Sequence, residues 1–409
     1  MKEIFYCNTM NQFRMKMEEL DFPRYVPVSY VIIDYEKSLY SKLDELPVIG
    51  RLNLIKQLGI AGTCTDITSL RYDAGSSRYI HSLICAAKMD HIAQTHDLDR
   101  NLGVAAGMLH DIATTPLSDS VSVELGMKDD KYFYRTLEKC PGVDELLEEC
   151  SISKKELTKA VTGKSNSPIG QLINSKDTID VDRWSYANWD ASILGMLPNR
   201  WRGCQVTDTF KHIMVENGKV IFTDFDSVSQ LLEARAQMFE RVYRNPQLMA
   251  KEAFLGQITR SLLEKGIITE DSVFEMVDQD FEALVKEHGG EICRKIFGFD
   301  GFDTYGMVSA KKEDVTDFLK QNTERPFAIK KPKRCNPAVE TPVMIDGKID
   351  TYRNFEPEHA YELEQRMSAW NHTTVYGYEN DRELAEAVFK AKKHFGVPKE
   401  TFYLPNRNH

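Results

Sequence analysis

The sequence predicts a mainly α fold with a helical core, a smaller α+β part at the C-terminal end, and β-hairpins. Apolar residues recur three or four positions apart through most of the first half of the chain, which is the spacing of helices with one buried face. Asn217-Gly218 and Asp346-Gly347 each separate two short β-rich runs, and this arrangement is a strong hairpin signal. A strand-like run and then an amphipathic helix over residues 373–395 indicate that the C-terminal part mixes both kinds of element.

Four segments before residue 120 carry clear element signals. The first is rich in β-branched residues and predicts a strand, whereas the other three have helical apolar spacing. Gly59 is a C-cap candidate for the first helix, and Ser76-Ser77 can cap the second. The segments are a strand over residues 26–35 and helices over residues 50–59, 78–95 and 100–111.

The remainder of the chain divides less sharply. Pro116 interrupts the helical pattern, and shorter helices are expected over residues 118–190, with further helices up to residue 297. A basic, Pro-rich stretch over residues 325–338 indicates a linker or an edge segment. We therefore predict four parts: an N-terminal segment (1–45), a core (46–205), a helical extension with a hairpin near 211–223 (206–325), and an α+β region (326–409).

The composition excludes several classes of protein. Among 409 residues, 42% are apolar and 28% are charged, which is ordinary for a soluble globular protein. The net charge of -10 argues against a stable nucleic-acid partner or an anionic membrane surface. The 8 cysteines are scattered without a Cys-x-x-Cys pair, which indicates free thiols in a reducing compartment. No apolar run is long enough for a membrane span or a signal peptide, so we expect a cytoplasmic protein.

An adjacent His-Asp pair, His110-Asp111, ends the apolar helix over residues 100–111 and is the first candidate for a metal site. His81 on the preceding helix and Asp182 on a later one add the same kinds of ligand from separate segments. Two histidines and two aspartates suit a transition metal with open positions for water and substrate. Such a metal lowers the pKa of bound water and polarises a phosphoryl oxygen. The sequence thus predicts a divalent or trivalent metal, with Mn, Fe, Co, Zn, Ni and Mg as candidates.

Each of these residues has a simpler interpretation when it is taken singly. A lone histidine on an apolar helix is more often structural, and Asp182 beside Arg183 is by default a surface ion pair. Arginines on helices are usually solvated, and tyrosines usually line a core or its rim. The functional interpretation depends on their occurring together. Guanidinium forks match phosphate oxygens, and the candidates for that role are Arg78, Arg183 and Arg235.

Taken together, these segments resemble the HD-domain phosphohydrolase superfamily, in which the metal ligands come in the order His, His-Asp, Asp. The resemblance implies that residues 46–205 form an HD-domain core and that residues 206–325 complete a nucleotide pocket. It also implies that Asp111 and Arg78 take part in catalysis. The ligands that it implies here are His81, His110, Asp111 and Asp182.

The similarity is closer to one branch, the dNTP triphosphohydrolases, which include bacterial dGTPases and the mammalian enzyme that combines SAM and HD domains. The matching segments are Arg51–Gly59, Ser76–Leu83 and Ile179–Tyr186, followed by Asp190. The similarity extends from about residue 45 to 265, with no counterpart for the last 100 or so residues. It implies a sugar site and a phosphate site, with contacts from Gln57, Leu58, Arg78, Arg183, Tyr186, Asp190, Arg235 and Tyr243.

Three positions depart from the pattern of this branch. Thr114 and Asp119 replace two histidines that usually follow the His-Asp pair, and Phe239 stands where the branch often has a phosphate-facing histidine. Threonine does no acid–base work near neutral pH, so Asp119 or Glu124 is the candidate acid. The leading hypothesis is a metal-dependent phosphohydrolase acting on a deoxynucleoside or nucleoside phosphate. The alternatives are a nucleotide-binding regulator with little turnover and a dinuclear iron oxygenase. The resemblance also implies a homo-oligomer.

Overall fold

The computed structural model describes residues 4–8, 11–15, 39–64, 77–126, 129–194, 206–298, 301–331, 335–368 and 372–398. The strand expected over residues 26–35 and part of the basic stretch over 325–338 lie outside these ranges. In the described part of the chain, no helix combines the length and the apolar character needed to cross a membrane.

The centre of the fold is a pair of buried helices, α3 (Arg78–Thr95) and α4 (Arg100–Leu109), which pack closely along each other. Ser77 caps α3, because its side chain accepts a hydrogen bond from the Ile80 amide, as the sequence predicts. Gly107 allows the close approach of the two helices: a Cβ atom at this position would lie 2.4 Å from Ala86 Cα. The tight pairing brings the C-terminal end of α4 against the first turns of α3.

Further helices cover this pair and contribute to one apolar core. The helix predicted over residues 50–59 is wrong, because the helix ends at Leu52 and Gly59 instead begins a 3₁₀ turn with a positive φ. Ile55 and Leu58 lie in the loop after this helix, and their side chains are buried there. Their spacing therefore reflects burial of a loop and not a helix. The covering elements are α1 (Leu39–Asp44), α2 (Pro47–Leu52), α6 (Asp129–Lys139), α7 (Val143–Glu149), α8 (Lys154–Val161), α9 (Pro168–Ile173) and α10 (Val181–Ile193). The short elements η3 (Gly59–Thr63) and α5 (Asp119–Leu125) belong to a second apolar cluster.

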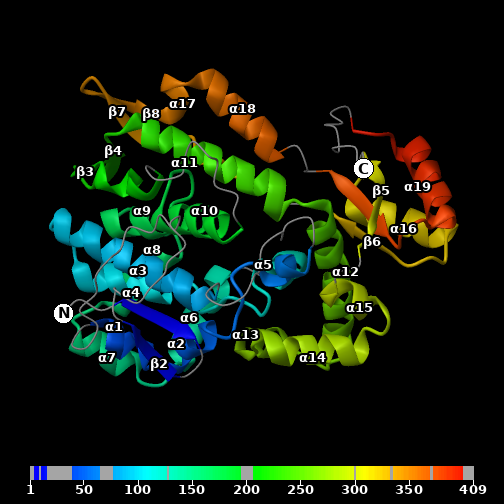
Figure 1. Cartoon of the computed structure of the whole chain (residues 1–409), viewed down its shortest axis with the longest axis horizontal. Coiled ribbons are helices and arrows are strands. Elements are labelled where there is room, and N and C mark those ends of the chain that lie inside the picture. Colours follow the sequence, from blue (N-terminus) through cyan, green and yellow to red (C-terminus); the bar gives the residue numbers. More distant parts are fainter. Residues whose placement is uncertain are drawn as a thin grey trace.

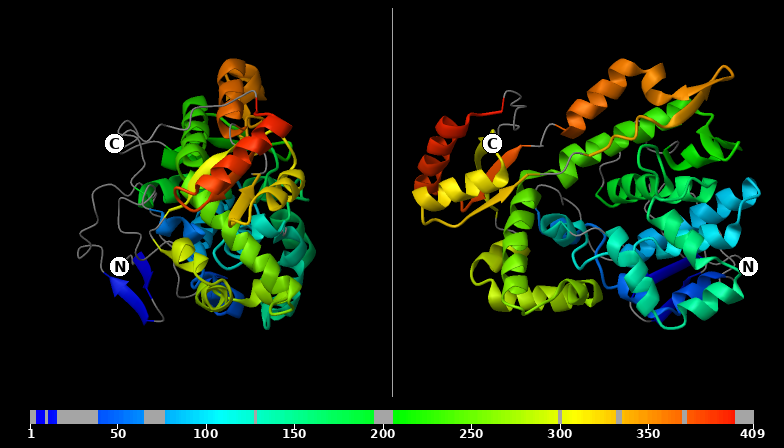
Figure 2. Two further views of the ribbon diagram at one scale, coloured as in Figure 1. Left: turned by 90° about the vertical axis from the view of Figure 1, so that its right-hand side faces the viewer. Right: turned by 180° about the vertical axis from the view of Figure 1, so that it is seen from behind.

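Two long helices carry the chain away from the centre (Figure 1). Helix α11 (Phe225–Met238) ends in a π-helical turn, η6 (Phe239–Tyr243), a type of local irregularity that is frequent at functional sites. Helix α12 (Pro246–Glu264) then runs in a different direction, as Figure 2 also shows. The helices around it are α13 (Glu270–Glu275), α14 (Asp278–His288) and α15 (Ile292–Phe297), and the 3₁₀ turn η5 (Val206–Lys211) comes before α11.

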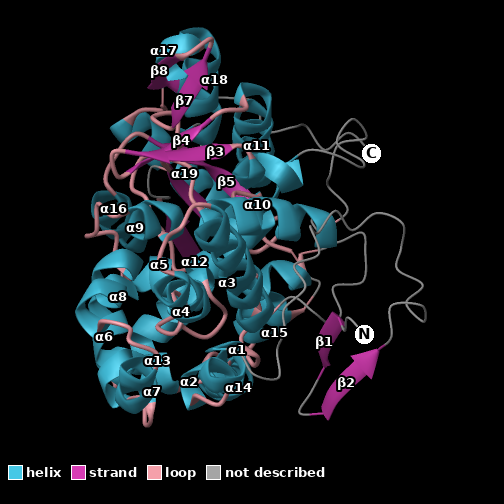
Figure 3. Ribbon diagram, turned by 90° about the vertical axis from the view of Figure 1, so that its left-hand side faces the viewer, coloured by secondary structure: helices cyan, strands magenta, loops and turns pink. Residues whose placement is uncertain are grey.

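Both predicted hairpins are present, and they join into one four-stranded sheet. The first pairs β3 (Ile213–Glu216) with β4 (Lys219–Phe222), and the second pairs β7 (Pro342–Ile345) with β8 (Lys348–Thr351). Both turn residues of each hairpin have positive φ, which matches their Asn-Gly and Asp-Gly sequences. A short parallel contact between β4 and β7 completes the order β3-β4-β7-β8, at one end of the molecule in Figure 3.

A three-stranded antiparallel sheet forms the α+β part at the other end of the molecule. Its order is β5-β9-β6, so the last strand lies between the two earlier ones. Strand β5 lies before residue 326, so this sheet spans the boundary predicted from the sequence. The elements are β5 (Asp303–Val308), α16 (Lys312–Asn322), β6 (Phe327–Lys330), β9 (Thr373–Gly377) and α19 (Arg382–Phe395), with α17 (Tyr352–Phe355) and α18 (Pro357–Ser368) near α11. The N-terminal strands β1 (Ile4–Asn8) and β2 (Asn11–Met15) pair with each other.

Candidate metal centre

Four predicted ligand side chains converge from α3, the end of α4 and the start of α10. His81 Nε2 lies 3.2 Å from His110 Nε2 and 3.0 Å from Asp182 Oδ1. Asp111 Oδ2 lies 3.7 Å from both of these histidine nitrogens. Ligand atoms at about 2 Å from one ion are separated by roughly 3–3.5 Å, so the four side chains fit a single metal ion.

Hydrogen bonds on the far side of each imidazole orient both histidines. His81 Nδ1 lies 3.1 Å from Ser185 Oγ, and His110 Nδ1 lies 2.8 Å from the Gly107 carbonyl oxygen, to which it donates. The Gly107 carbonyl sets the tautomer of His110, so that its Nε2 carries the lone pair that a metal needs, and the Ser185 hydroxyl orients the His81 ring. The contact to His110 is local, because Gly107 precedes it by one helical turn. The contact to His81 comes from α10, where Ser185 follows Asp182 by one turn.

The carboxylates and imidazoles of this cluster shift each other's pKa values. Burial lowers the pKa of His110, but Asp111 and Asp182 outweigh this effect and raise it to about 9. Burial raises the pKa of Asp182, but hydrogen bonds to His110 and His81 hold it well below its usual range. The centre thus gathers negative charge that a bound cation would neutralise in place of protons.

Arg78 and Asp119 lie at the edge of this cluster. Arg78 Nη1 donates to Asp111 Oδ2 over 2.8 Å, and Arg78 Nε donates to Ser118 Oγ over 2.9 Å. Asp119 Oδ2 lies 3.7 Å from Arg78 Nη2, and 73% of the Asp119 side chain is exposed. The structure therefore brings all three predicted catalytic residues, Arg78, Asp111 and Asp119, to one side of the cluster.

Three of the predicted sugar-site residues, Tyr186, Asp190 and Tyr243, form a second group along α10 and the π-helical turn. Tyr243 Oη donates to Asp190 Oδ2 over 2.7 Å, and the Tyr186 and Tyr243 rings pack edge to face. Burial raises the pKa of Asp190 to about 7. Gln57 Oε1 and Asp190 Oδ1 are buried without a hydrogen-bond partner among the described residues. Buried polar atoms normally have partners, so both positions suit contacts to a ligand.

Two predicted phosphate-binding arginines are engaged within the protein. Arg183 Nη1 donates to the Ser175 carbonyl oxygen over 2.5 Å and also pairs with Asp180. Arg235 Nε donates to Tyr186 Oη over 2.6 Å. Their contacts to a substrate therefore stay predictions.

A segment from the C-terminal region contacts Arg235, and no pattern in the sequence indicates this contact. Arg235 Nη1 donates to the backbone carbonyl oxygen of Asn336 over 2.5 Å. The side-chain Nδ2 of Asn336 donates to Asp177 Oδ1 over 2.8 Å. Cys335 Sγ lies 3.4 Å from Arg235 Nη2. These contacts join residues about 100 or more positions apart, which local patterns do not reveal.

Cys85 lies beside the predicted ligands but is not among the site residues predicted from the sequence. It follows His81 by four residues on α3. Its sulfur lies 3.9 Å from His81 Nε2, and the potential ligand atoms of His81, Cys85 and His110 lie within 4.8 Å of one another. Four residues along a helix separate neighbours on one face, so the His81–Cys85 spacing could have shown this contact. Burial raises the pKa of the Cys85 thiol well above its usual range.

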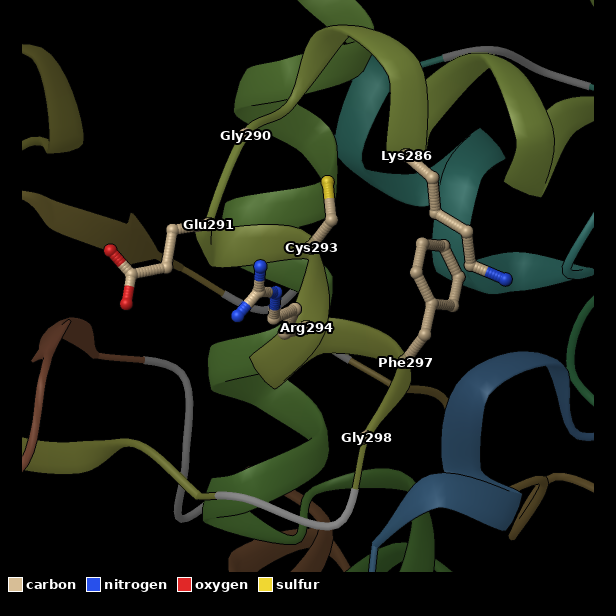
Figure 4. A pocket seen from close by; sticks show the side chains of 7 residues that line it. All are labelled: Lys286, Gly290, Glu291, Cys293, Arg294, Phe297 and Gly298. Carbon is tan, nitrogen blue, oxygen red and sulfur yellow. The ribbon is translucent and has the colours of Figure 1, made fainter.

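A separate open pocket lies at α14 and α15, and none of the predicted site residues line it. Its volume is about 820 Å³. Figure 4 labels the residues that line it, which are Lys286, Gly290, Glu291, Cys293, Arg294, Phe297 and Gly298.

Comparisons with known proteins agree with this architecture. An uncharacterised protein of Methanocaldococcus jannaschii is 26% identical over 262 residues, which are 61% of this chain and 52% of the relative. The chain thus spans about half the length of that curated relative. A hypothetical protein from Aquifex aeolicus has a TM-score of 0.62 at 18% identity and covers 87% of this chain and 95% of its own. A phosphohydrolase from Bacteroides thetaiotaomicron has a TM-score of 0.64 at 15% identity. The match covers 86% of this chain and 99% of the Bacteroides protein.

The match to the Aquifex aeolicus protein covers 87% of the chain, so it includes at least part of the last 100 or so residues. Residues 78–187 match the family model of the HD domain, and all four predicted metal ligands lie within this range. This range of the chain is therefore similar to the HD domain.

Proposed function

We propose that the protein is a metal-dependent phosphohydrolase that acts on a phosphate ester or anhydride of a nucleoside phosphate, with deoxynucleoside triphosphates as the leading substrates. The observation that carries the proposal is the convergence of His81, His110, Asp111 and Asp182 within an HD domain. The similarity of fold to a phosphohydrolase from Bacteroides thetaiotaomicron is consistent with this class of reaction.

The residues around the cluster suit attack of water on phosphorus. When bound, a metal in this position supplies a nucleophilic water near neutral pH and polarises a phosphoryl oxygen. Arg78, held between Asp111 and Ser118, places a cation where charge develops on the phosphoryl group. Asp119 is exposed beside Arg78 and would deliver the proton to the leaving oxygen, in place of the histidines that Thr114 and Asp119 replace.

The second group of residues would bind the nucleoside. Asp190 and Gln57 have buried oxygens that suit the hydroxyls of a sugar. The rings of Tyr186 and Tyr243 would form the wall of the sugar pocket, and Leu58 would contact the sugar from the loop before η3. Arg183 and Arg235 would hold phosphates after exchanging some of their present contacts. Self-association into a homo-oligomer belongs to the same proposal.

A second candidate function is nucleotide binding with little turnover. The observations that favour it are the buried Thr114, which has no acid–base group, and the engagement of Arg235 by Tyr186 and Asn336. Such a regulator would bind a nucleotide and gain thermal stability by mass action without forming product.

The test is product release from a panel of nucleotides with Mn, Fe, Co, Ni, Zn or Mg. We expect the wild type to release phosphate or tripolyphosphate and Asp182→Ala to release neither, because the variant lacks one ligand oxygen. Equal release by the two proteins would refute the proposal. A nucleotide-induced rise in melting temperature without product over hours would favour the regulator. Elemental analysis tests the oxygenase alternative, which requires two irons per chain.

A further inference from the structure

Asp278, the first residue of α14, is a buried carboxylate outside the HD domain, with 5% of its surface exposed. Its two oxygens accept hydrogen bonds from two separate loops: Oδ2 from the Lys56 amide over 2.9 Å and Oδ1 from the Leu117 amide over 2.7 Å. The first loop contains Gln57 and Leu58, and the second directly precedes Asp119. One side chain thus links a predicted sugar-binding loop to the loop of the candidate acid.

The second loop has a conformation that needs such support. Leu117 and Ser118 are consecutive residues with φ of 55° and 54°. Side chains with a Cβ atom adopt this left-handed region at a cost, and they remain in it only where surrounding contacts enforce it. Gly59 also packs directly on the loop, because a Cβ atom there would lie 2.2 Å from the Leu117 carbonyl oxygen. Packing between the two loops therefore stabilises the conformation of each.

The contacts continue from this turn to the metal cluster. Ser118 Oγ donates to the Lys56 carbonyl oxygen over 2.6 Å and accepts from Arg78 Nε over 2.9 Å. Arg78 in turn donates to Asp111 Oδ2 over 2.8 Å. A continuous series of hydrogen bonds therefore connects Asp278 to a predicted metal ligand.

A second contact docks the same corner of α13 and α14 against the HD domain. Arg51 Nε donates to the Met276 carbonyl oxygen over 3.0 Å, and Arg51 Nη2 donates to the Thr114 carbonyl oxygen over 2.8 Å. The chain after the His-Asp pair is thus held through a carbonyl at Thr114 and through an amide at Leu117. This pattern fixes the path of the backbone that presents Asp119.

We propose that Asp278 is a positioning residue of the metal centre, which holds the loops at Lys56 and Leu117 and thereby sets the positions of Arg78 and Asp119. An ionised carboxylate is suited to this role because both of its oxygens accept and neither donates. An asparagine has nearly the same shape but turns one NH₂ group toward a backbone amide, so Asp278→Asn breaks one of the two contacts with little change in volume. The catalytic part of the proposal rests on the proposed function.

The experiment combines hydrogen exchange with kinetics. We compare the wild type, Asp278→Asn, Asp278→Glu and a control, Asp381→Asn. Asp381 also accepts a backbone amide at the start of a helix, from Leu384 over 3.0 Å, but it lies in the α+β part away from the metal centre. We expect faster amide exchange in peptides 54–59 and 112–120 of Asp278→Asn only. We also expect its kcat to fall by about 10–100-fold, as for outer-shell partners of metal sites, with KM changed less than about threefold and partial recovery in Asp278→Glu.

The outcomes separate this inference from the proposed function. Unchanged exchange in both peptides of Asp278→Asn overturns the inference, whatever the activity. If Asp278→Asn shows faster exchange but has the same kcat as the control, the inference is also overturned, because the contact is then only structural. If the wild type has no activity on any nucleotide, the proposed function fails, and the exchange result alone decides whether Asp278 positions these loops.

A second variant covers the case in which Asp278→Asn does not fold. Ser118→Ala removes the hydroxyl between the Lys56 carbonyl oxygen and Arg78 Nε but leaves the buried carboxylate paired. We expect a fall in kcat of similar size with little change in melting temperature. If Ser118→Ala has the same kcat as the wild type, the inference is overturned.

Discussion

Arg78 donates to Asp111 over 2.8 Å, so a buried guanidinium holds one of the four predicted metal ligands in place. The same arginine begins α3, which also carries His81 one turn later. In the proposed function, Arg78 therefore has two tasks: it would orient a predicted metal ligand, and it would place a positive charge beside the phosphoryl group of the substrate.

Arg78→Lys should not restore what Arg78→Ala loses. A lysine has a single ammonium group and does not reproduce the fork that contacts Asp111 and Ser118 together. We expect both variants to lose about 10–100-fold in Mn²⁺ affinity or in kcat, measured by calorimetric titration and product release. Arg100→Ala is the control, because Arg100 forms an exposed pair with Asp90 at 2.6 Å. Wild-type behaviour of Arg78→Lys would contradict the orienting role.

Metal binding should stabilise the fold. A ligand that binds only the native state at 100 times its Kd contributes about 2.7 kcal/mol, and the cluster of two carboxylates and two imidazoles forms only in that state. We expect Mn²⁺ or Co²⁺ to raise the Tm of chelator-treated protein by a few degrees in scanning calorimetry. Asp182→Ala should show no such rise, and an equal rise in this variant would place the ion elsewhere.

Asp119→Asn should remove the proton donor and leave the metal bound. General acid catalysis contributes about 10²–10⁴-fold, so we expect kcat to fall within that range while elemental analysis finds the wild-type metal content. Asp144→Asn is a matched control, because 68% of its side chain is exposed against 73% for Asp119. A loss smaller than about threefold would exclude Asp119 as the acid.

The buried Asp190 should make stability depend on pH. Burial raises its pKa to about 7 in the folded protein, against an ordinary value of about 3.9. A carboxyl whose folded pKa is raised contributes its stability at low pH and loses it as the pH rises from about 4 to about 7, which corresponds to roughly 4 kcal/mol.

Asp190→Asn should remove this dependence, because the amide stays neutral. We expect its Tm relative to the wild type to increase between pH 5 and pH 8, while its KM for a nucleotide rises because a sugar contact is lost. Parallel Tm curves of the two proteins over this pH range would show that Asp190 does not titrate there.

Arg183→Ala should affect stability more than substrate binding. The variant leaves Asp180, which is 1% exposed, without its charged partner. Removal of one partner of a buried ion pair costs about 3–5 kcal/mol, to be measured by urea unfolding, and the double variant with Asp180→Asn should recover part of it. A rise in KM with unchanged stability would instead favour the predicted phosphate contact.

The sequence by itself predicted several of the elements and a ligand set, although its helix over residues 50–59 is wrong. Helical spacing, the Ser77 cap and the two turn pairs predicted α3, α4 and both hairpins, because caps and turns depend on residues within a few positions of each other. The His-Asp pair and its two partner segments predicted the metal cluster for the same reason, since each ligand stands at a recognisable place in its own helix.

Only the tertiary structure decided which distant segments support that cluster. The joining of the two hairpins, the contact of Asn336 with Arg235 and the link from Asp278 to Leu117 each connect residues about 100 or more positions apart. Buried backbone amides and guanidinium groups must find partners, but any of many segments can supply one. Packing alone selects among them, and it places a carboxylate from α14 behind the loop that carries Asp119.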